Sequence, residues 1–144
     1  MTNSSSSAAG VTNPPATTLQ ASNLMASITV KDLDRSLAWY RDAVGFKVEQ
    51  EMEFEGKRRA VRLSAGPVFL LLNLDNGARG WDRVKGEGIS LQITTSQSID
   101  AIADRIRSSG FTLDTEPADM PWGVRSFKAK DPDGFNFAFS SERK

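Results

Sequence analysis

The chain contains no histidine and no cysteine among its 144 residues. The absence of cysteine excludes disulfides and thiolate chemistry, and it fits a reducing cytosol. The absence of histidine removes the most frequent general base and the commonest neutral ligand of catalytic transition metals. No serine can be activated by an imidazole, which excludes the usual hydrolase triads, and no catalytic residue is predicted.

Net charge is also lacking, because 18 Lys and Arg balance 18 Asp and Glu. This balance excludes the basic surface that nucleic acids or anionic membranes attract. The longest apolar run, Val68 to Leu72, is far too short to span a bilayer. With 39% hydrophobic residues, we expect one cytoplasmic domain with neither a nucleic-acid nor a membrane partner.

The first 23 residues differ from the rest of the chain. They are rich in Ser, Thr, Ala and Pro and contain no charged or aromatic residue. Such a segment buries too little apolar area to offset the entropy of ordering, so a flexible tail is predicted over 1–23. The domain is expected at 24–142, with a first module at 24–75, a connector at 76–87 and a second module at 88–142.

The pattern of the first module predicts one strand, one helix and three more strands. Ile28 and Val30 alternate with polar residues, as in a half-buried strand. Asp32 and Asp34 are both candidate N-caps, and the apolar residues that follow recur at helical spacing: Leu33, Leu37, Tyr40 and Val44. Gly45 fits the position after the helix. Strands are then expected at 48–54, 58–64 and 67–74.

The same order repeats in the second module. A strand is expected around 89–93, followed by a helix with an apolar stripe of Ile99, Ile102, Ala103 and Ile106. Three strands should follow, around Leu113, at 124–130 and at 135–140. Each half is too small to be stable alone, so two halves or two chains must pair. The predicted class is α+β with two βαβββ modules, which excludes most doubly wound α/β folds.

Three segments resemble the glyoxalase/bleomycin-resistance/extradiol-dioxygenase (vicinal oxygen chelate) superfamily. The segment from Val30 to Phe46, with Trp39-Tyr40 inside it, resembles the opening strand and helix of that family. Trp122-Gly123 stands ahead of the penultimate strand, and the sequence Asp131-Pro132-Asp133-Gly134 precedes the last strand, as in the family. The resemblance covers residues 25 to about 141. It implies sheets that curl around a cup, and a homodimer.

The resemblance also implies where a metal would be bound. Metal-binding members place His and Glu ligands in the first and last strands of each module, and these positions fall on Met25, Leu71, Gly88 and Ala138. A register error of one residue gives no better donors: Ala26, Leu70 or Leu72, Ile89, and Phe137 or Phe139. A thioether and alkyl groups do not hold Fe²⁺, Zn²⁺, Ni²⁺ or Mn²⁺. No metal and no other cofactor is therefore predicted, which places the chain with the metal-free branch.

Strand alternation predicts which side chains face the cup, since residues two apart share one face. The strongly apolar set should face the helices: Ile28, Val30, Leu70, Leu72, Ile89, Leu91, Phe137 and Phe139. The opposite set should face the cup: Met25, Ser27, Thr29, Phe69, Leu71, Asn73, Gly88, Ser90, Gln92, Asn136, Ala138 and Ser140. A dry core of unpaired hydroxyls and amides would cost about 1–3 kcal/mol for each group, so a wet or ligand-filled cup is expected.

Two tryptophans and three arginines have open roles. Trp81 and Trp122 could stack on a flat ligand at the cup mouth or pack as lids. One of Arg58, Arg62 and Arg125 could reach an acidic ligand group, and the basic cluster that contains the first two is otherwise a solvated hairpin.

Three functional hypotheses follow. The first is a dimer that binds or sequesters a small organic molecule, as antibiotic-sequestering members of the metal-free branch do. The second is a metal-independent lyase, isomerase or other enzyme of the superfamily, and the third is a scaffold with no physiological ligand. The residues predicted to bind the ligand are Met25, Ser27, Phe69, Leu71, Asn73, Ser90, Gln92, Trp81, Trp122, Arg125, Asn136 and Ala138.

Overall fold

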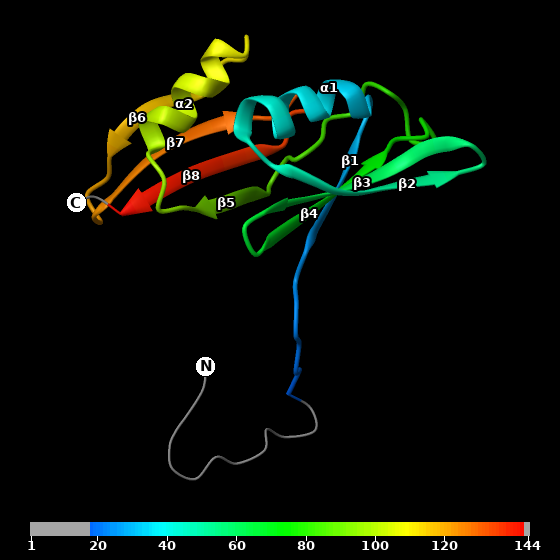
Figure 1. Cartoon of the computed structure of the whole chain (residues 1–144), viewed down its shortest axis with the longest axis horizontal. Coiled ribbons are helices and arrows are strands. Elements are labelled where there is room, and N and C mark those ends of the chain that lie inside the picture. Colours follow the sequence, from blue (N-terminus) through cyan, green and yellow to red (C-terminus); the bar gives the residue numbers. More distant parts are fainter. Residues whose placement is uncertain (1–17, 143–144) are drawn as a thin grey trace.

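The computed structural model describes residues 18–142, and its strands form two four-stranded mixed sheets (Figure 1). The first sheet has the order β1-β4-β3-β2; its strands are β1 (Ala26–Val30), β2 (Lys47–Phe54), β3 (Lys57–Ala65) and β4 (Val68–Leu74). The second has the order β5-β8-β7-β6; its strands are β5 (Ser90–Thr94), β6 (Thr115–Asp119), β7 (Val124–Lys130) and β8 (Asn136–Glu142). The first and last strands of each module pair in parallel. The predicted α+β fold with two βαβββ modules is confirmed.

The tail predicted over 1–23 is described only from residue 18. Residues 18–23 are exposed and belong to no helix or strand, and residues 1–17 lie outside the described part. Between 18 and 142, no helix has the length and apolar character needed to cross a membrane.

The helix of the first module changes its winding halfway. It begins as α1 (Leu33–Leu37) and continues as the π-helical segment η1 (Ala38–Val44). Asp32 is the N-cap and accepts hydrogen bonds from the next turn, and Gly45 ends the helix with a φ of 109°. Because a π turn holds more residues than an α turn, neighbouring residues lie closer to one face. Trp39 and Tyr40 are consequently both fully buried.

The two modules share one core. The Trp39 ring, on the first module's helix, lies 5.3 Å from the Phe137 ring and 6.5 Å from the Phe139 ring of β8, measured between centroids. The helix of the second module, α2 (Ile99–Ser108), contacts η1 as well as its own strands. Figure 1 shows both helices along the same side of the two sheets. The helices therefore leave the opposite faces of the two sheets uncovered.

The prediction of which strand residues face the helices is largely confirmed. Six of the eight are buried: Ile28, Val30, Leu70, Leu72, Phe137 and Phe139. Leu91 is half-buried. Ile89 was placed wrongly, because it lies in a turn before β5 and is 56% exposed.

One strand lies away from its predicted position. The strand expected around Leu113 is β6, which spans Thr115–Asp119. This edge strand has the sequence TEPAD and is exposed or half-buried throughout, so no apolar alternation marks it in the sequence. Its register with β7 is also irregular.

Candidate functional site

The first sheet carries a continuous row of side chains on the face opposite the helices. The strand register sets Ser27 beside Leu71, and Leu71 beside Arg62. The Asn73 amide donates a hydrogen bond to the Ser27 hydroxyl at 2.6 Å. The Arg62 guanidinium carbon lies 4.4 Å from the centre of the Phe69 ring. This face therefore combines a polar pair, an apolar middle and a cation stacked on an aromatic ring.

The second sheet carries a more polar row. Gln92 lies beside Ala138 in the register, and its amide donates to the Ser90 hydroxyl at 2.9 Å. The Asn136 amide donates to the Gly86 carbonyl oxygen at 3.2 Å and to that of Ile89 at 3.3 Å, so it also holds the end of the connector. Ser90 and Gln92 are exposed, whereas Ala138 is only 5% exposed. A ligand on this face can reach the exposed Gln92 amide and Ser90 hydroxyl, which also contact each other.

The remaining predicted residues lie around these rows. Met25 and Gly88 precede β1 and β5 instead of lying within them. Trp122 is 73% exposed in the turn before β7, and Trp81 is 51% exposed in the connector. A Cβ atom added to Gly77 would stand 2.4 Å from the Trp81 ring. The indole therefore packs on the connector backbone, which favours the packing role for Trp81.

Arg125, predicted to contact the ligand, already has two acidic partners. Its guanidinium pairs with Asp100 of α2 at 2.8 Å and with Asp119 of β6 at 3.1 Å. Hydrogen bonds from Arg125 to these two carboxylates raise the pKa of its guanidinium. The three side chains line a hollow of about 550 Å³ beside the first turn of α2. Arg125 thus links α2 to the sheet at this end.

The other two candidate arginines lie on opposite sides of the first sheet. Arg58 forms ion pairs with Asp34 of α1 and with Glu51, so it lies on the helix side. Arg62 has no hydrogen bond or ion pair with any described residue, and its Nε atom is buried without a partner. Of the three candidates, Arg62 is the one left available on the face opposite the helices.

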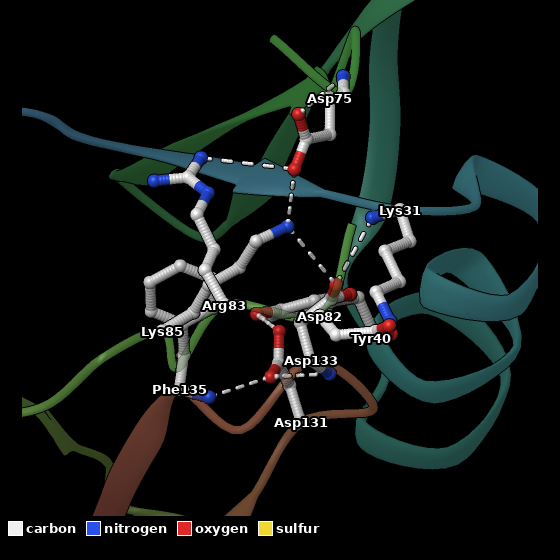
Figure 2. A network of polar contacts seen from close by, with 10 residues as sticks. Lys31, Tyr40, Asp75, Asp82, Arg83, Lys85, Asp131, Asp133 and Phe135 are labelled. Atoms are coloured by element: carbon white, nitrogen blue, oxygen red, sulfur yellow. Dashed lines mark hydrogen bonds and ion pairs between the residues drawn. The ribbon is translucent and has the colours of Figure 1, made fainter. Parts of the chain in front are cut away.

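A buried group of charges joins the two modules and the connector (Figure 2). The Lys85 ammonium lies 2.9 Å from Asp75, just after β4, and 3.5 Å from Asp133 in the turn before β8. All three side chains are 4–6% exposed. Asp133 also accepts a hydrogen bond from the Lys31 backbone N–H at 3.0 Å. This group was not predicted from the sequence, and no local signal marks it, since Val84 beside Lys85 is 79% exposed.

The turn before β8 is held by a second buried carboxylate. The Tyr40 hydroxyl donates to Asp131 at 2.7 Å, and the backbone N–H groups of Asp133 and Phe135 donate to its other oxygen. Burial raises the pKa of Asp131, and the hydrogen bonds from Tyr40 and Phe135 oppose that rise. Burial also raises the pKa of Tyr40. Asp131 therefore fixes the turn before β8 against the first module's helix.

These faces do not fit a transition metal. The polar group beside Leu71 is the Ser27 hydroxyl of β1, and the polar group beside Ala138 is the Gln92 amide of β5. Neutral hydroxyls and amides are weak ligands for Zn²⁺, Fe²⁺ or Ni²⁺. Among residues 18–142, no three acidic, histidine or cysteine side chains gather where they could hold an ion.

Comparison with known proteins agrees with this architecture. The sequence model of the Glyoxalase/Bleomycin resistance protein/Dioxygenase superfamily matches residues 22–139. No curated protein matches the chain. Among solved structures, TioX from Micromonospora sp. ML1 superposes with a TM-score of 0.69 at 19% identity, over 85% of this chain and 100% of that one.

Two further solved structures are similar. TnmS3, an antibiotic binding protein from Streptomyces sp. CB03234, has a TM-score of 0.65 at 22% identity, over 88% of this chain and 100% of its own. A superfamily member from Sphaerobacter thermophilus DSM 20745 has a TM-score of 0.65 at 25% identity, over 85% of this chain and 98% of its own. The chain belongs to the glyoxalase/bleomycin resistance protein/dioxygenase superfamily.

Proposed function

We propose that this chain binds and sequesters a small organic molecule, without a metal ion, on the sheet faces opposite its helices. The observation that carries the proposal is the make-up of those faces. On the first sheet the exposed Ser27 lies beside the half-buried apolar side chains of Leu71 and Phe69, and on the second sheet Ser90 and Gln92 are exposed. A surface with a few polar groups among apolar side chains is typical of small-molecule sites.

The similarity to TnmS3 supports the choice of ligand class. That protein is an antibiotic binding protein, and its fold covers 88% of this chain. A natural product or drug is therefore the first class of ligand to test. Binding and release without turnover fits a chain that has neither histidine nor cysteine.

We expect the purified protein to contain no stoichiometric transition metal. The residues at the positions that the resemblance assigns to the family's metal ligands offer a thioether, alkyl groups and no carboxylate: Met25, Leu71, Gly88 and Ala138. Elemental analysis of protein purified without chelators is the measurement. Close to one Ni, Zn, Fe or Mn per subunit, retained through mild chelation, would contradict the metal-free part of the proposal.

We also expect a homodimer in which both chains contribute to each cup. The two faces belong to open sheets, and a ligand held from both sides needs a second sheet opposite the first. Exposed apolar side chains are available for such contacts, including Val68 at 50% and Val84 at 79% exposure. Sedimentation velocity at micromolar concentration should give the mass of two chains. A stable monomer under those conditions would contradict this assembly.

Replacing Gln92 with leucine should separate ligand binding from a structural role. Gln92 is exposed, and its amide contacts Ser90. A ligand that hydrogen-bonds to this amide would lose one partner in the variant, which costs about 1–3 kcal/mol of binding energy. The melting temperature should be unchanged or slightly higher. Calorimetric titration and thermal unfolding of the same variant measure both quantities.

The control for this variant is Gln97→Leu. Gln97 is also exposed but lies in the loop before α2, so its replacement should leave ligand affinity unchanged. A lower melting temperature for Gln92→Leu, with no compound bound in a broad screen, would favour the scaffold hypothesis and end the binding proposal.

A further inference from the structure

The charge on Arg62 lacks the partner that the other arginines have. Among residues 18–142, six arginines contact a carboxylate or carbonyl oxygen: Arg41, Arg58, Arg83, Arg105, Arg107 and Arg125. Three that contact none are exposed to water: Arg35, Arg59 and Arg79. Arg62 differs from both groups because it is half-buried, and its Nε atom is out of contact with water and has no acceptor. A guanidinium stays charged at any physiological pH, and partly buried charges are normally paired.

The carboxylate beside Arg62 is already bound by other groups. Glu49 accepts a hydrogen bond from Ser64 at 2.7 Å and pairs with Lys47 at 3.8 Å. The Ser64 hydrogen bond lowers the pKa of Glu49 most, followed by the charge of Lys47 and then that of Arg62. No ion pair joins Glu49 to Arg62 within 4 Å. The donors of Arg62 therefore remain available to an acceptor that comes from outside this chain.

Phe69 sets the orientation of this cation. The register places Arg62 opposite Leu71 and Phe69 opposite Ser64, so Arg62 and Phe69 are diagonal neighbours on β3 and β4. The guanidinium lies over the Phe69 ring at 4.4 Å. Stacking of this kind holds the guanidinium plane while leaving its edge free for a carboxylate. The apolar side chain of Leu71 continues the surface on which a flat ring could lie.

We propose that Arg62, Phe69 and Leu71 form a subsite for a planar aromatic acid: a ligand with an aromatic ring system next to a carboxylate or similarly acidic group. This inference rests on the proposed function and names the ligand chemistry of the same faces. The acidic group pairs with the edge of the Arg62 guanidinium, and the ring system lies across Phe69 and Leu71.

The experiment compares an aromatic acid with its neutral analogue. Binding of 2-naphthoate and 2-naphthamide to the full-length protein is measured by ligand-observed NMR and calorimetry, alongside a panel of neutral aromatic compounds. The wild type should bind the acid at least about tenfold more tightly than the amide. In Arg62→Met, which keeps a long side chain without charge, the two affinities should differ by less than about twofold.

Two further variants complete the design. Arg59→Met removes an exposed arginine from the same strand, and it should retain the preference for the acid. Phe69→Leu should weaken both naphthalene probes while keeping part of that preference. Melting temperatures and sedimentation of each variant are recorded, and Arg62→Met should fold with a melting temperature at or above that of the wild type.

Four results would overturn the inference, and they differ in whether the proposed function fails as well. Equal binding of acid and amide by the wild type, or an unchanged preference in Arg62→Met, rejects the acidic ligand and leaves the proposed function standing. If none of the probes or neutral compounds binds, both the subsite and the proposed function are rejected. If Arg62→Met instead dissociates a dimer, Arg62 pairs with a carboxylate of the second copy and the subsite is rejected.

Discussion

Replacing Lys85 with methionine should lower the melting temperature by about 10 °C or more. The substitution removes the cation between two carboxylates, Asp75 and Asp133, whose side chains are almost completely buried. Breaking a buried ion pair is far more harmful than replacing it entirely, because a charge is left without its partner. Thermal unfolding followed by circular dichroism measures the effect.

Lys57→Met is the matched control. Lys57 begins β3, is exposed and forms no ion pair with any residue from 18 to 142, so its replacement should change the melting temperature by no more than about 2 °C. If Lys85→Met is as stable as this control, the buried charges do not hold the modules together.

The wild type and Lys85→Met should also differ in how their stability responds to acid. The hydrogen bond from Lys85, followed by one from the Gly77 N–H, lowers the pKa of Asp75 from 3.8 to about 2. A carboxyl group with a depressed folded-state pKa stabilises the fold above its unfolded pKa, and this contribution is lost as the pH falls. The advantage of the wild type over Lys85→Met should therefore shrink between pH 4 and pH 2. A difference that stays constant across that range would assign the effect to packing.

The position of these charges gives them a role in the site. Lys85 belongs to the connector, Asp75 follows the strand that carries Leu71 and Asn73, and Asp133 precedes the strand that carries Asn136. The network therefore fixes the end of β4 relative to the start of β8, and with it the relative orientation of the two candidate binding faces. If the proposed function holds, a ligand that contacts both faces would depend on this arrangement.

Sequence patterns predicted the strands that bury one face. In β1, β4 and β8, apolar residues at alternate positions pack under the helices. The alternation of apolar residues in the sequence therefore predicts which positions are buried. The edge strand β6 has no buried face and was misplaced for that reason. Lys85 and its partners are 10 and 48 residues apart, so no local pattern could reveal their pairing.

Arg58 and Arg62 of β3 show how a β-bulge interrupts the alternation of side chains along a strand. Arg58 and Arg62 are four residues apart, so a regular strand would put both on one face. The pairing of β2 with β3 shifts between Met52 and Glu53, where β3 accommodates one extra residue, Arg59. Such a bulge reverses the alternation beyond it. Arg58 consequently meets α1 on the helix side, and Arg62 alone faces the candidate binding surface.

Replacing Trp39 with alanine should destabilise the whole domain by about 3–5 kcal/mol. Trp39 has no exposed surface and contacts Tyr40 of its own helix and Phe137 and Phe139 of the other module. Trp122→Ala is the control, since Trp122 is 73% exposed and its loss should change stability by no more than about 0.5 kcal/mol. Chemical denaturation of the three proteins measures the differences.

Trp39→Phe tests whether the ring itself is the stabilising element. The Trp39 Nε1 atom is buried without a hydrogen-bonding partner, so phenylalanine removes an unpaired donor while retaining most of the aromatic contact with β8. Its cost should be much smaller than that of alanine. Because α2 still contacts η1 and the Asp75–Lys85–Asp133 charges still join the two modules, Trp39→Ala should unfold in a single transition, at lower denaturant concentration. Two separated transitions would show that each module can fold by itself and that the Trp39 ring is needed to couple their unfolding.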